Sequence, residues 1–523
     1  MKRWKTLAVW LAILAVAAAV RLPALRTGLP YIGYVDEGHV VHHAVTLLAK
    51  GTWDPGWYIY PTLPIYAVAL PALAWSPVYA ALHDRPLRED LSPSPAIYYD
   101  FVSPADLLVL GRLGTLAFSL GLVVLTGLFA RRLAGPAAGW FAAWLAALLP
   151  AFVIRAVVVN VNPMAAFFGL AAMFFAEDVR EGRRPWRSAA LAGVMTGLAG
   201  VSKYPSILVC LPVTLSVLLA RRPWGERLRL LFLAGGTAAA AAIVAMPALV
   251  LRTGEVRTQL QAQSEVYRRD VIGSYWDQAI LRAEWDLPFN HPELGTTFLA
   301  LTAAGLAIGL WDRRWRKTVL GWILFAAATF ALFAPYQFRA FRNLLPLIPL
   351  ACLLVTLAYA RLREALPSQP RWALDLAAAA FPVVFFVPGL VEFGRHQLAV
   401  TDTREQAIEW LADHTRPRDR VLLVEELVFL PSRIESLPAR TAVQPWAQAR
   451  DRIFIQRFDY LVLPGLRDAG GQDMIPRSLA ERILRHYQAE VQLGSTPTFD
   501  VPGYFKGNDQ IIYILKRKPK TGR

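Results

Sequence analysis

Long apolar runs separated by short polar or basic segments dominate the first three quarters of the chain. A helix needs roughly 20 apolar residues to cross the hydrocarbon core of a membrane. By this criterion we predict eleven spans, at residues 6–22, 106–129, 134–152, 159–176, 188–202, 205–220, 229–250, 294–311, 318–334, 343–360 and 373–391. The fifth and sixth are short, so we expect a hairpin or a tilted pair.

Basic residues lie at every second junction between these spans. The basic segments are the N-terminus, Arg131-Arg132, Arg180 to Arg187, Arg221 to Arg229, Arg313 to Lys317, and Arg361 to Arg371. Short cytoplasmic loops retain Lys and Arg, so this alternation predicts a cytoplasmic N-terminus and a retained first span. It places residues 23–105, residues 251–293 and the tail from about 392 on the outer face.

The tail has a different pattern. Helical periodicity at Thr403 to His414 is followed by apolar strands at 420–424 and 460–463, a helix at about 478–488 and a strand at 510–515. We therefore predict a mainly α, polytopic transmembrane helical bundle over residues 1–391, and a small extracytoplasmic α/β domain over residues 392–523.

Composition agrees with a membrane protein. Of the 523 residues, 55% are hydrophobic and only 18% are charged, against roughly 25% charged in soluble proteins. The net charge of +16 is spread between apolar runs, which argues against nucleic-acid binding. Cys210 and Cys352 both lie in apolar segments, so neither a disulfide framework nor a Cys-based zinc site is expected.

Two adjacent acids follow the first predicted span, in Tyr34-Val35-Asp36-Glu37-Gly38-His39. An amphipathic helix comes directly after them. In the simplest interpretation Asp36 caps this helix and Glu37 favours its first turn through the helix dipole. A catalytic role is the alternative, and the neighbouring motifs favour it.

Those motifs occur in a recognisable order. After the acids come Gly51-Thr52-Trp53, Tyr60-Pro61-Thr62-Leu63-Pro64, Gly111-Arg112-Leu113, Arg131-Arg132-Leu133-Ala134-Gly135, Pro150, Gly197-Leu198-Ala199 and Ser202-Lys203-Tyr204. In this order the chain resembles the GT-C superfamily, specifically the protein O-mannosyltransferases and the lipid A aminoarabinose transferases, over most of residues 1–360. One departure is that Tyr60 stands where related aminoarabinose transferases have Lys, and Thr62 replaces the second proline of their motif.

The resemblance implies an inverting glycosyltransferase that moves a sugar from a polyprenyl-phosphate donor to a hydroxyl group of a protein, lipid or glycan. Carried over, Asp36 is the general base, and Glu37 supports the site or binds the acceptor. An inverting transfer needs one such carboxylate and no protein nucleophile. The Arg-rich and Ala-rich composition suggests a bacterium, so we expect a multi-pass protein of the bacterial cytoplasmic membrane.

The leaving polyprenyl phosphate requires fixed cations. Candidates are Lys203, beside Tyr204 at the outer end of the short hairpin, and Arg339 and Arg342 in a short outer turn. Charges at membrane depth are costly unless they serve a cavity or a partner, so we predict that these residues bind the donor phosphate. Snorkelling to lipid headgroups is the alternative.

Aromatic and polar residues of the outer loops are candidates for substrate binding: His39, His43, Tyr60, Tyr267 and Arg268. His39 and His43 lie at i and i+4 and could hold a divalent metal, but the chemistry requires no cofactor, and polar contacts are the favoured interpretation. Tyr267 and the aromatic residues of Ser274-Tyr275-Trp276-Asp277 could stack on sugar faces, but anchoring at the membrane interface is the more common role of such residues. Loop 251–293 could act as a lid.

Two other functions remain open. A flippase of a lipid-linked saccharide would also use cations within the membrane, but it predicts matched repeats and broken helices, and the sequence has neither. A membrane-anchored binding protein would need one span rather than eleven.

Overall fold

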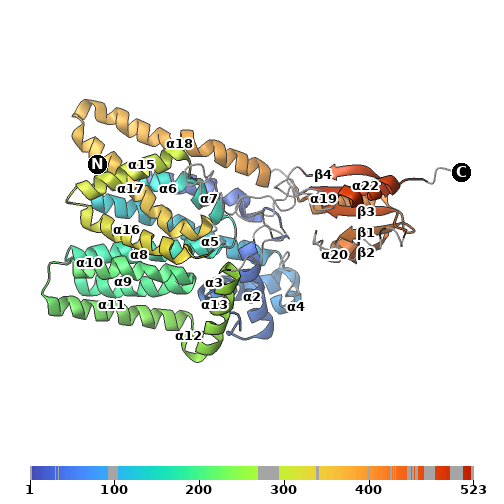
Figure 1. Cartoon of the computed structure of the whole chain (residues 1–523), viewed down its shortest axis with the longest axis horizontal. Helices are drawn as coiled ribbons and strands as arrows, with labels where there is room; N and C mark the ends of the chain where they lie inside the picture. The colour runs from blue at the N-terminus through green and yellow to red at the C-terminus, as the bar shows by residue number, and fades with distance from the viewer. Residues whose placement is uncertain are drawn as a thin grey trace.

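The structure, a computed structural model, shows a long helical body with a small sheet domain at one end (Figure 1). It describes residues 3–29, 31–32, 35–91, 104–268, 294–336, 341–398, 401–424, 427, 429, 431–444, 449, 453, 457–464, 477–494 and 511–519. The side chains of a few of these, Asp36 among them, are outside the description.

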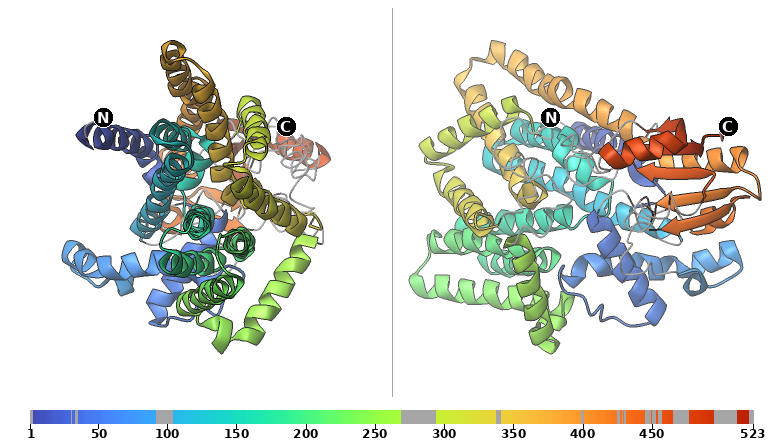
Figure 2. Two further views of the ribbon diagram at one scale, coloured as in Figure 1. Left: turned by 90° about the vertical axis from the view of Figure 1, so that its left-hand side faces the viewer. Right: turned by 45° about the vertical axis from the view of Figure 1, so that its right-hand side comes forward.

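Each of the eleven predicted apolar segments is helical. The helices of the body are α1 (Arg3–Ala19), α5 (Asp106–Ala134), α6 (Pro136–Leu148), α7 (Pro150–Ala156), α8 (Val161–Arg180), α9 (Pro185–Ser202), η2 (Tyr204–Val209), α10 (Cys210–Leu218), α11 (Trp224–Ala245), α15 (Thr296–Trp311), α16 (Arg316–Phe333), η3 (Phe341–Leu347), α17 (Ile348–Ala365) and α18 (Ser368–Leu398). Seen from the end opposite the sheet domain, many of these helices are viewed nearly along their axes (left view of Figure 2).

The predicted number of spans is not confirmed. Among the described residues, seven helical segments are long and apolar enough to cross a membrane, or eight if α6 and α7, bent by 54°, count as one span. α8 and α9 are outside this set, and α10 and α15 are shorter apolar helices. Conversely, α3 (Thr62–His83), which we placed in an outer loop as an amphipathic stretch, meets the criteria, because its exposed side is also apolar, with Leu70, Leu73 and Leu82.

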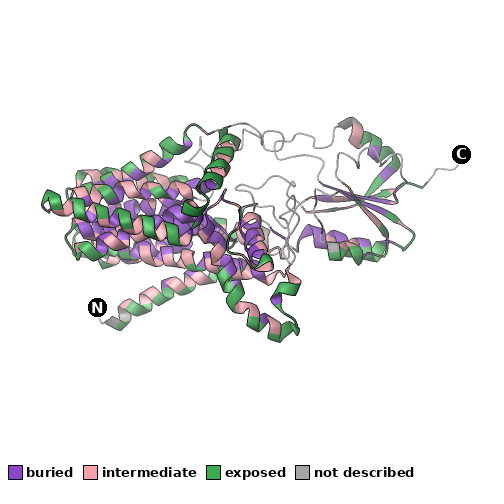
Figure 3. Cartoon of the chain, turned by 90° about the horizontal axis from the view of Figure 1, so that it is seen from below, coloured by how far each residue is buried: buried purple, intermediate pink, exposed green. Residues whose placement is uncertain are grey.

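Close backbone contacts hold the helices together. A Cβ atom on Gly193 of α9 would lie 2.1 Å from the carbonyl oxygen of Ala234 in α11, and one on Gly197 would lie 2.2 Å from that of Ala238. Only glycine permits this approach, which membrane helices commonly use because dispersion contacts rather than hydrophobic exclusion drive their association. Exposed positions run along the outer sides of the helices (Figure 3). Large apolar residues are exposed too, among them Phe232 and Val244, as a lipid-facing surface requires.

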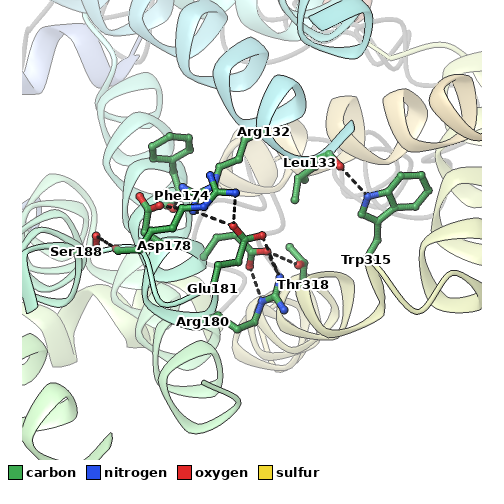
Figure 4. Close-up of polar contacts among 11 residues, drawn as sticks. Arg132, Leu133, Phe174, Asp178, Arg180, Glu181, Ser188, Trp315 and Thr318 are labelled. Atoms are coloured by element: carbon green, nitrogen blue, oxygen red, sulfur yellow. Dashed lines mark hydrogen bonds and ion pairs between the residues drawn. The ribbon is translucent and has the colours of Figure 1, made fainter. Parts of the chain in front are cut away.

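Three of the predicted basic segments meet at one end of the body. Arg132 at the end of α5 forms an ion pair with Asp178 of α8 and donates to the carbonyl oxygen of Phe174 at 3.3 Å (Figure 4). The Trp315 indole donates to the carbonyl oxygen of Leu133 at 3.0 Å, and Thr318 donates to buried Glu177 at 3.0 Å. Segments 131–133, 177–181 and 315–318 therefore share an end, as the alternation predicts, while the side of the membrane on which this end lies stays a prediction.

The other end carries the predicted outer elements. They are η1 (Leu22–Arg26), α2 (Val35–Lys50), α3, α4 (Leu87–Asp90), α12 (Ala248–Leu251) and α13 (Thr253–Arg268). α2 buries Val40, Val41, Ala44 and Val45 against Ile65 and Val68 of α3 and Leu107 and Leu108 of α5. A separate apolar core therefore fixes α2 on the helical body.

The C-terminal domain is an α/β module. Its elements are α19 (Thr403–His414), β1 (Arg420–Val424), α20 (Pro431–Glu435), β2 (Arg440–Gln444), β3 (Tyr460–Pro464), α22 (Arg477–His486), β4 (Tyr487–Leu493) and β5 (Ile512–Arg517). The sheet has the order β2-β1-β3-β5-β4. β1 pairs in parallel with β2 and β3, whereas β5 pairs antiparallel with β3 and β4.

Both faces of this sheet are covered. Val421 and Leu423 pack with α19, and Leu422 and Val424 pack on the other side with Ile483 of α22. Burial on both faces explains why β1 reads as a continuous apolar run. The domain lies at the end of the body where α2 and α7 are found (Figure 1; right view of Figure 2). α18 continues to Leu398, so the domain boundary at 391/392 stays a prediction.

Candidate functional site

Glu37 of α2 is fully buried and held on both oxygens. Arg112 of α5 donates to Glu37 Oε1 from Nε at 2.8 Å and to Oε2 from Nη2 at 2.9 Å. The Val159 amide, between α7 and α8, donates to Oε1 at 2.8 Å. A bidentate guanidinium pair fixes a carboxylate in orientation as well as in charge.

Arg112 also fixes the chain that leads into α2. Its Nη1 donates to the carbonyl oxygens of Leu25 at 2.9 Å and Thr27 at 2.8 Å. One buried side chain thus joins η1, α2 and α5. Both oxygens of Glu37 are engaged in these contacts, an arrangement that suits the supporting role implied by the resemblance. The grouping of Glu37 with Asp36 as a catalytic residue stays a prediction.

Asp36 belongs to α2, immediately before Glu37, while its side chain lies outside the described part of the chain. Its backbone position is therefore set by the Glu37 and Arg112 contacts. The prediction that Asp36 is the general base stays a prediction.

His39 and His43 follow Asp36 on α2 and pack against one tryptophan. Their rings lie 5.6 Å and 4.2 Å from the Trp57 ring, close to parallel with it. Trp57 in turn contacts Tyr60 at 5.6 Å between ring centroids. Burial, followed by the charges of His42 and His39, lowers the pKa of His43 to about 3, so its imidazole is neutral at neutral pH.

A cavity of about 380 Å³ lies beside this aromatic group. Its walls come from the segment before α3, from η2, α13, α16 and η3. The lining residues are Ile59, Tyr60, Pro61, Lys203, Tyr204, Pro205, Ile207, Leu208, Leu260, Gln263, Ser264, Tyr267, Leu332, Phe333, Tyr336 and Asn343. Four predicted donor or substrate residues from three distant segments are thereby brought together: Tyr60, Lys203 with Tyr204, and Tyr267.

Lys203 is the charged group of the cavity, and only 8% of it is exposed. Its ammonium donates to Asn162 Oδ1 at 2.6 Å and to Asn343 Oδ1 at 2.7 Å. Asn162 is itself held, because its amide side chain donates to Asn160 Oδ1 at 2.6 Å. Two neutral amide oxygens thus fix the position of a buried cation at the cavity wall.

The segment before α3 is tied to α13 by hydrogen bonds, and both segments contribute lining residues to the cavity. Gln259 accepts from the Tyr58 amide at 2.6 Å and donates to the Gly56 carbonyl oxygen at 3.1 Å. The Tyr204 hydroxyl donates to the Tyr58 carbonyl oxygen at 2.9 Å. α13 therefore forms one wall of the cavity and is fixed to the segment before α3.

The remaining predicted residues lie as follows. Arg342 is buried in η3 next to Asn343, and Arg268 is exposed at the end of α13, outside the cavity lining. Arg339 and the Ser274–Asp277 segment lie outside the described residues. Within the described part of the chain, no three His, Cys, Asp or Glu side chains gather in a way that could hold a metal ion.

Sequence reasoning missed Asn162, Asn343 and Arg112 as site residues. A signal existed for the first, because Asn160 and Asn162 interrupt an apolar run, and buried polar groups in such runs need partners. Asn343 follows Arg342 directly and could have been included with it. Nothing local to Arg112 pointed to its partner 75 residues earlier.

Comparisons with known proteins agree with this architecture. Residues 109–250, less than a third of the chain, match the model of the dolichyl-phosphate-mannose-protein mannosyltransferase family. No curated protein sequence matches the chain. Among solved structures, ArnT from Cupriavidus metallidurans bound to undecaprenyl phosphate is similar, with a TM-score of 0.54, 14% identity, and coverage of 97% of this chain and 97% of that chain.

A second similar structure is the oligosaccharyltransferase AglB from Archaeoglobus fulgidus, in complex with an inhibitory peptide and a dolichol-phosphate. Its TM-score is 0.53 at 12% identity, covering 99% of this chain and 74% of that chain. At such identities the likeness establishes the fold. The resemblance to GT-C membrane glycosyltransferases seen in the sequence is thereby confirmed, and the chain is a multi-pass membrane protein.

Proposed function

We propose that this chain, which has the GT-C fold, transfers a sugar from a polyprenyl-phosphate donor to a hydroxyl acceptor on the outer face of the bacterial cytoplasmic membrane, with inversion at the anomeric carbon. One observation carries the proposal: a buried lysine stands at the wall of a largely apolar cavity. The enzyme would need no cofactor.

The cavity suits a lipid-linked substrate. Ile207 of η2 and Leu332 of α16 line it and are 44% and 37% exposed. Apolar lining residues of this kind can hold the apolar chain of a polyprenyl phosphate. We infer that the cavity opens between η2 and α16 toward the hydrocarbon region, so that the polyprenyl chain need not leave the bilayer.

Lys203 suits the phosphate. As the sugar carbon separates from the phosphate oxygen, negative charge grows on that oxygen, and a preorganised cation stabilises it most when water is excluded. Asn162 and Asn343 already hold the ammonium in place, so little reorganisation is needed during the reaction. Tyr204 and the buried Arg342, next to Asn343, are the other predicted phosphate ligands.

Asp36 completes the reaction. The acceptor hydroxyl oxygen attacks the anomeric carbon, the bond from that carbon to the phosphate oxygen breaks, and the proton of the hydroxyl passes to the Asp36 carboxylate. General-base catalysis of this kind contributes about 10²- to 10⁴-fold. Glu37 and Arg112 hold the helix that carries Asp36.

The comparisons support the class of donor. The matching family is described by dolichyl-phosphate-mannose, and the similar ArnT and AglB structures contain undecaprenyl phosphate and dolichol-phosphate. We extend to this chain only the shared chemistry, a sugar carried on a polyprenyl phosphate.

The test is sugar transfer in membranes that contain wild type, Asp36→Asn or Asp84→Asn at matched expression, with a panel of radiolabelled polyprenyl-phosphate sugars. Asp84 is an exposed acid of the same outer region with a left-handed backbone that Asn also tolerates, so it is the matched control. We expect transfer by wild type and by Asp84→Asn, and a loss of about a hundredfold or more in Asp36→Asn.

Full transfer by Asp36→Asn would refute its role as the base. If wild type transfers from no donor but moves labelled lipid-linked saccharide across proteoliposome membranes, the chain is a flippase and the proposal is wrong.

A further inference from the structure

The C-terminal domain touches the segment that precedes Asp36 through one arginine. Arg404, at the start of α19, is 2% exposed, and its guanidinium carbon lies 3.8 Å from the centroid of the Tyr31 ring. Tyr31 belongs to the outer segment between η1 and α2 and is fully buried. The contact therefore joins two parts of the chain more than 370 positions apart.

Asp402 holds this arginine in place. Its side chain caps α19 by accepting from the Arg404 amide at 2.9 Å, and it also accepts from Arg404 Nε at 2.8 Å and Nη2 at 2.7 Å. A planar guanidinium fixed along one edge presents its face to the Tyr31 ring, which is the geometry of a cation–π contact. Lysine has no such planar edge.

Arg404 lies at the start of the buried side of α19. It precedes Ala407, Ile408 and Leu411, which pack against the sheet, by three, four and seven residues, so all four lie on one side of the helix. Its guanidinium lies over the Tyr31 ring of the membrane part. Arg404 therefore stands where the C-terminal domain meets the segment before α2.

Tyr31 lies within a segment that is held at both ends. Arg112 fixes Leu25 and Thr27 before it and Glu37 after it, and Arg404 contacts its middle. Asp36 lies between Tyr31 and Glu37 in sequence. Arg112 of the membrane part therefore holds the chain before and after the proposed base, and Arg404 of the C-terminal domain contacts it at Tyr31.

We propose that Arg404 is a positioning residue, through which the C-terminal domain sets the placement of Asp36 by way of Tyr31. This inference rests on the proposed transfer activity. It assigns the C-terminal domain a part in turnover: docking completes the site, and undocking leaves donor binding intact but slows the chemical step.

The experiment is a double-mutant cycle on kcat and on the donor KM, with Arg404→Leu, Tyr31→Leu and the double variant. Displacement of a catalytic group by about 1 Å can cost on the order of a hundredfold, so we expect each single variant to lower kcat about tenfold or more with the donor KM within about twofold. The double variant should lose no more than the worse single variant. Tyr31→Phe keeps the ring face and should retain wild-type kcat.

Arg420→Leu is the matched control. The Arg420 guanidinium lies 5.2 Å from the Phe458 ring inside the C-terminal domain, so this variant removes a cation–π contact that does not reach the membrane part. It should leave kcat unchanged. An equal loss of kcat in Arg420→Leu, unchanged kcat in Arg404→Leu, or additive losses in the cycle would each overturn the proposal.

Hydrogen–deuterium exchange tests the contact without any activity. In Arg404→Leu the peptide covering residues 24–32 should exchange faster than in wild type, while α5 peptides do not change. Equal exchange around Tyr31 would overturn the positioning role. If wild type shows no transfer but the exchange difference is present, the proposed function fails and the docking contact stands.

Discussion

Replacing Glu37 by Gln should destabilise the outer end of the helical body strongly. The substitution keeps the shape of the side chain but removes its charge. It also places the N–H donors of an amide against the Arg112 guanidinium, which has only donors itself. Arg112 is 2% exposed, so its guanidinium remains buried with its charge uncompensated. Breaking a buried ion pair on one side costs about 3–5 kcal/mol.

The pair predicts a distinct pattern in a mutant cycle. Replacing both residues, in Glu37→Leu with Arg112→Leu, removes both charges together, and such replacements are far milder than the loss of one partner. The cost that remains comes from the orphaned polar groups at Leu25, Thr27 and Val159, at about 1–3 kcal/mol for each group that water does not reach. The double variant should therefore cost less than the sum of the two single variants.

Thermal unfolding in detergent can be followed through a native thiol. Cys352 of α17 is fully buried, and Cys210 is only partly so. In a Cys210→Ala background, a thiol-reactive fluorophore reports the exposure of Cys352 as the helices separate. For a chain this large, 3–5 kcal/mol corresponds to a decrease of roughly 5 °C or more in the apparent Tm.

Asp36→Asn is the matched control, because it changes the neighbouring acid in the same way. We expect Asp36→Asn to lose transfer at a nearly wild-type Tm, and Glu37→Gln to lose Tm. A wild-type Tm for Glu37→Gln would refute the buried pair, and equal Tm losses in both variants would refute the division of roles between the two acids.

Three further outcomes follow from the structure. Lys203→Met should lower transfer about a hundredfold, the usual effect of losing one group that stabilises a developing anion, measured in the same membranes; transfer within twofold of wild type would contradict its role. The pKa of His43 is about 3 in the folded protein against about 6.5 in the unfolded chain, so below pH 6.5 only the unfolded state binds a proton at this side chain. The free energy of unfolding therefore falls as the pH drops below about 6.5, by about 2 kcal/mol at pH 5. His43→Gln should reduce the fall in Tm between pH 7.5 and 5. Gly193→Ala should lower Tm, because its Cβ atom would meet the backbone of α11. In the control Gly235→Ala the new Cβ atom has nothing within 4 Å, so Tm should be equal or higher. Equal effects of the two variants would contradict the close α9–α11 contact.

The sequence predicts well those features that depend on local periodicity. α19 begins and ends at the residues expected, Thr403 and His414, and β1 covers the apolar run 420–424. Apolar length located every helix of the body. It could not fix the number of spans, since α8 carries Glu177 and Asp178 on the last turn of an otherwise apolar helix, and α3 is apolar on all sides.

The features that were missed depend on contacts between distant segments. β2 lacks an apolar alternation of its own and pairs with β1. β4 does alternate apolar and polar residues from Tyr487 to Leu493, but the helix predicted at 478–488 overlapped its start, and the strand signal was missed. Lys203 was predicted from its burial in an apolar run, but its partner Asn343 lies 140 residues later. Nothing in the local sequence around Glu37 shows that Arg112, 75 residues later, engages both of its oxygens.

The opening that we infer between η2 and α16 means that the donor concentration relevant to this protein is its concentration within the membrane. If donor and spent carrier pass Ile207 and Leu332, they exchange within the bilayer and never enter bulk water. The rate then follows the mole fraction of donor in the membrane and its two-dimensional diffusion, and diluting the bilayer with inert lipid slows turnover even when the amount of donor per volume of sample is constant. Supply of substrate is in that case a property of the membrane's composition.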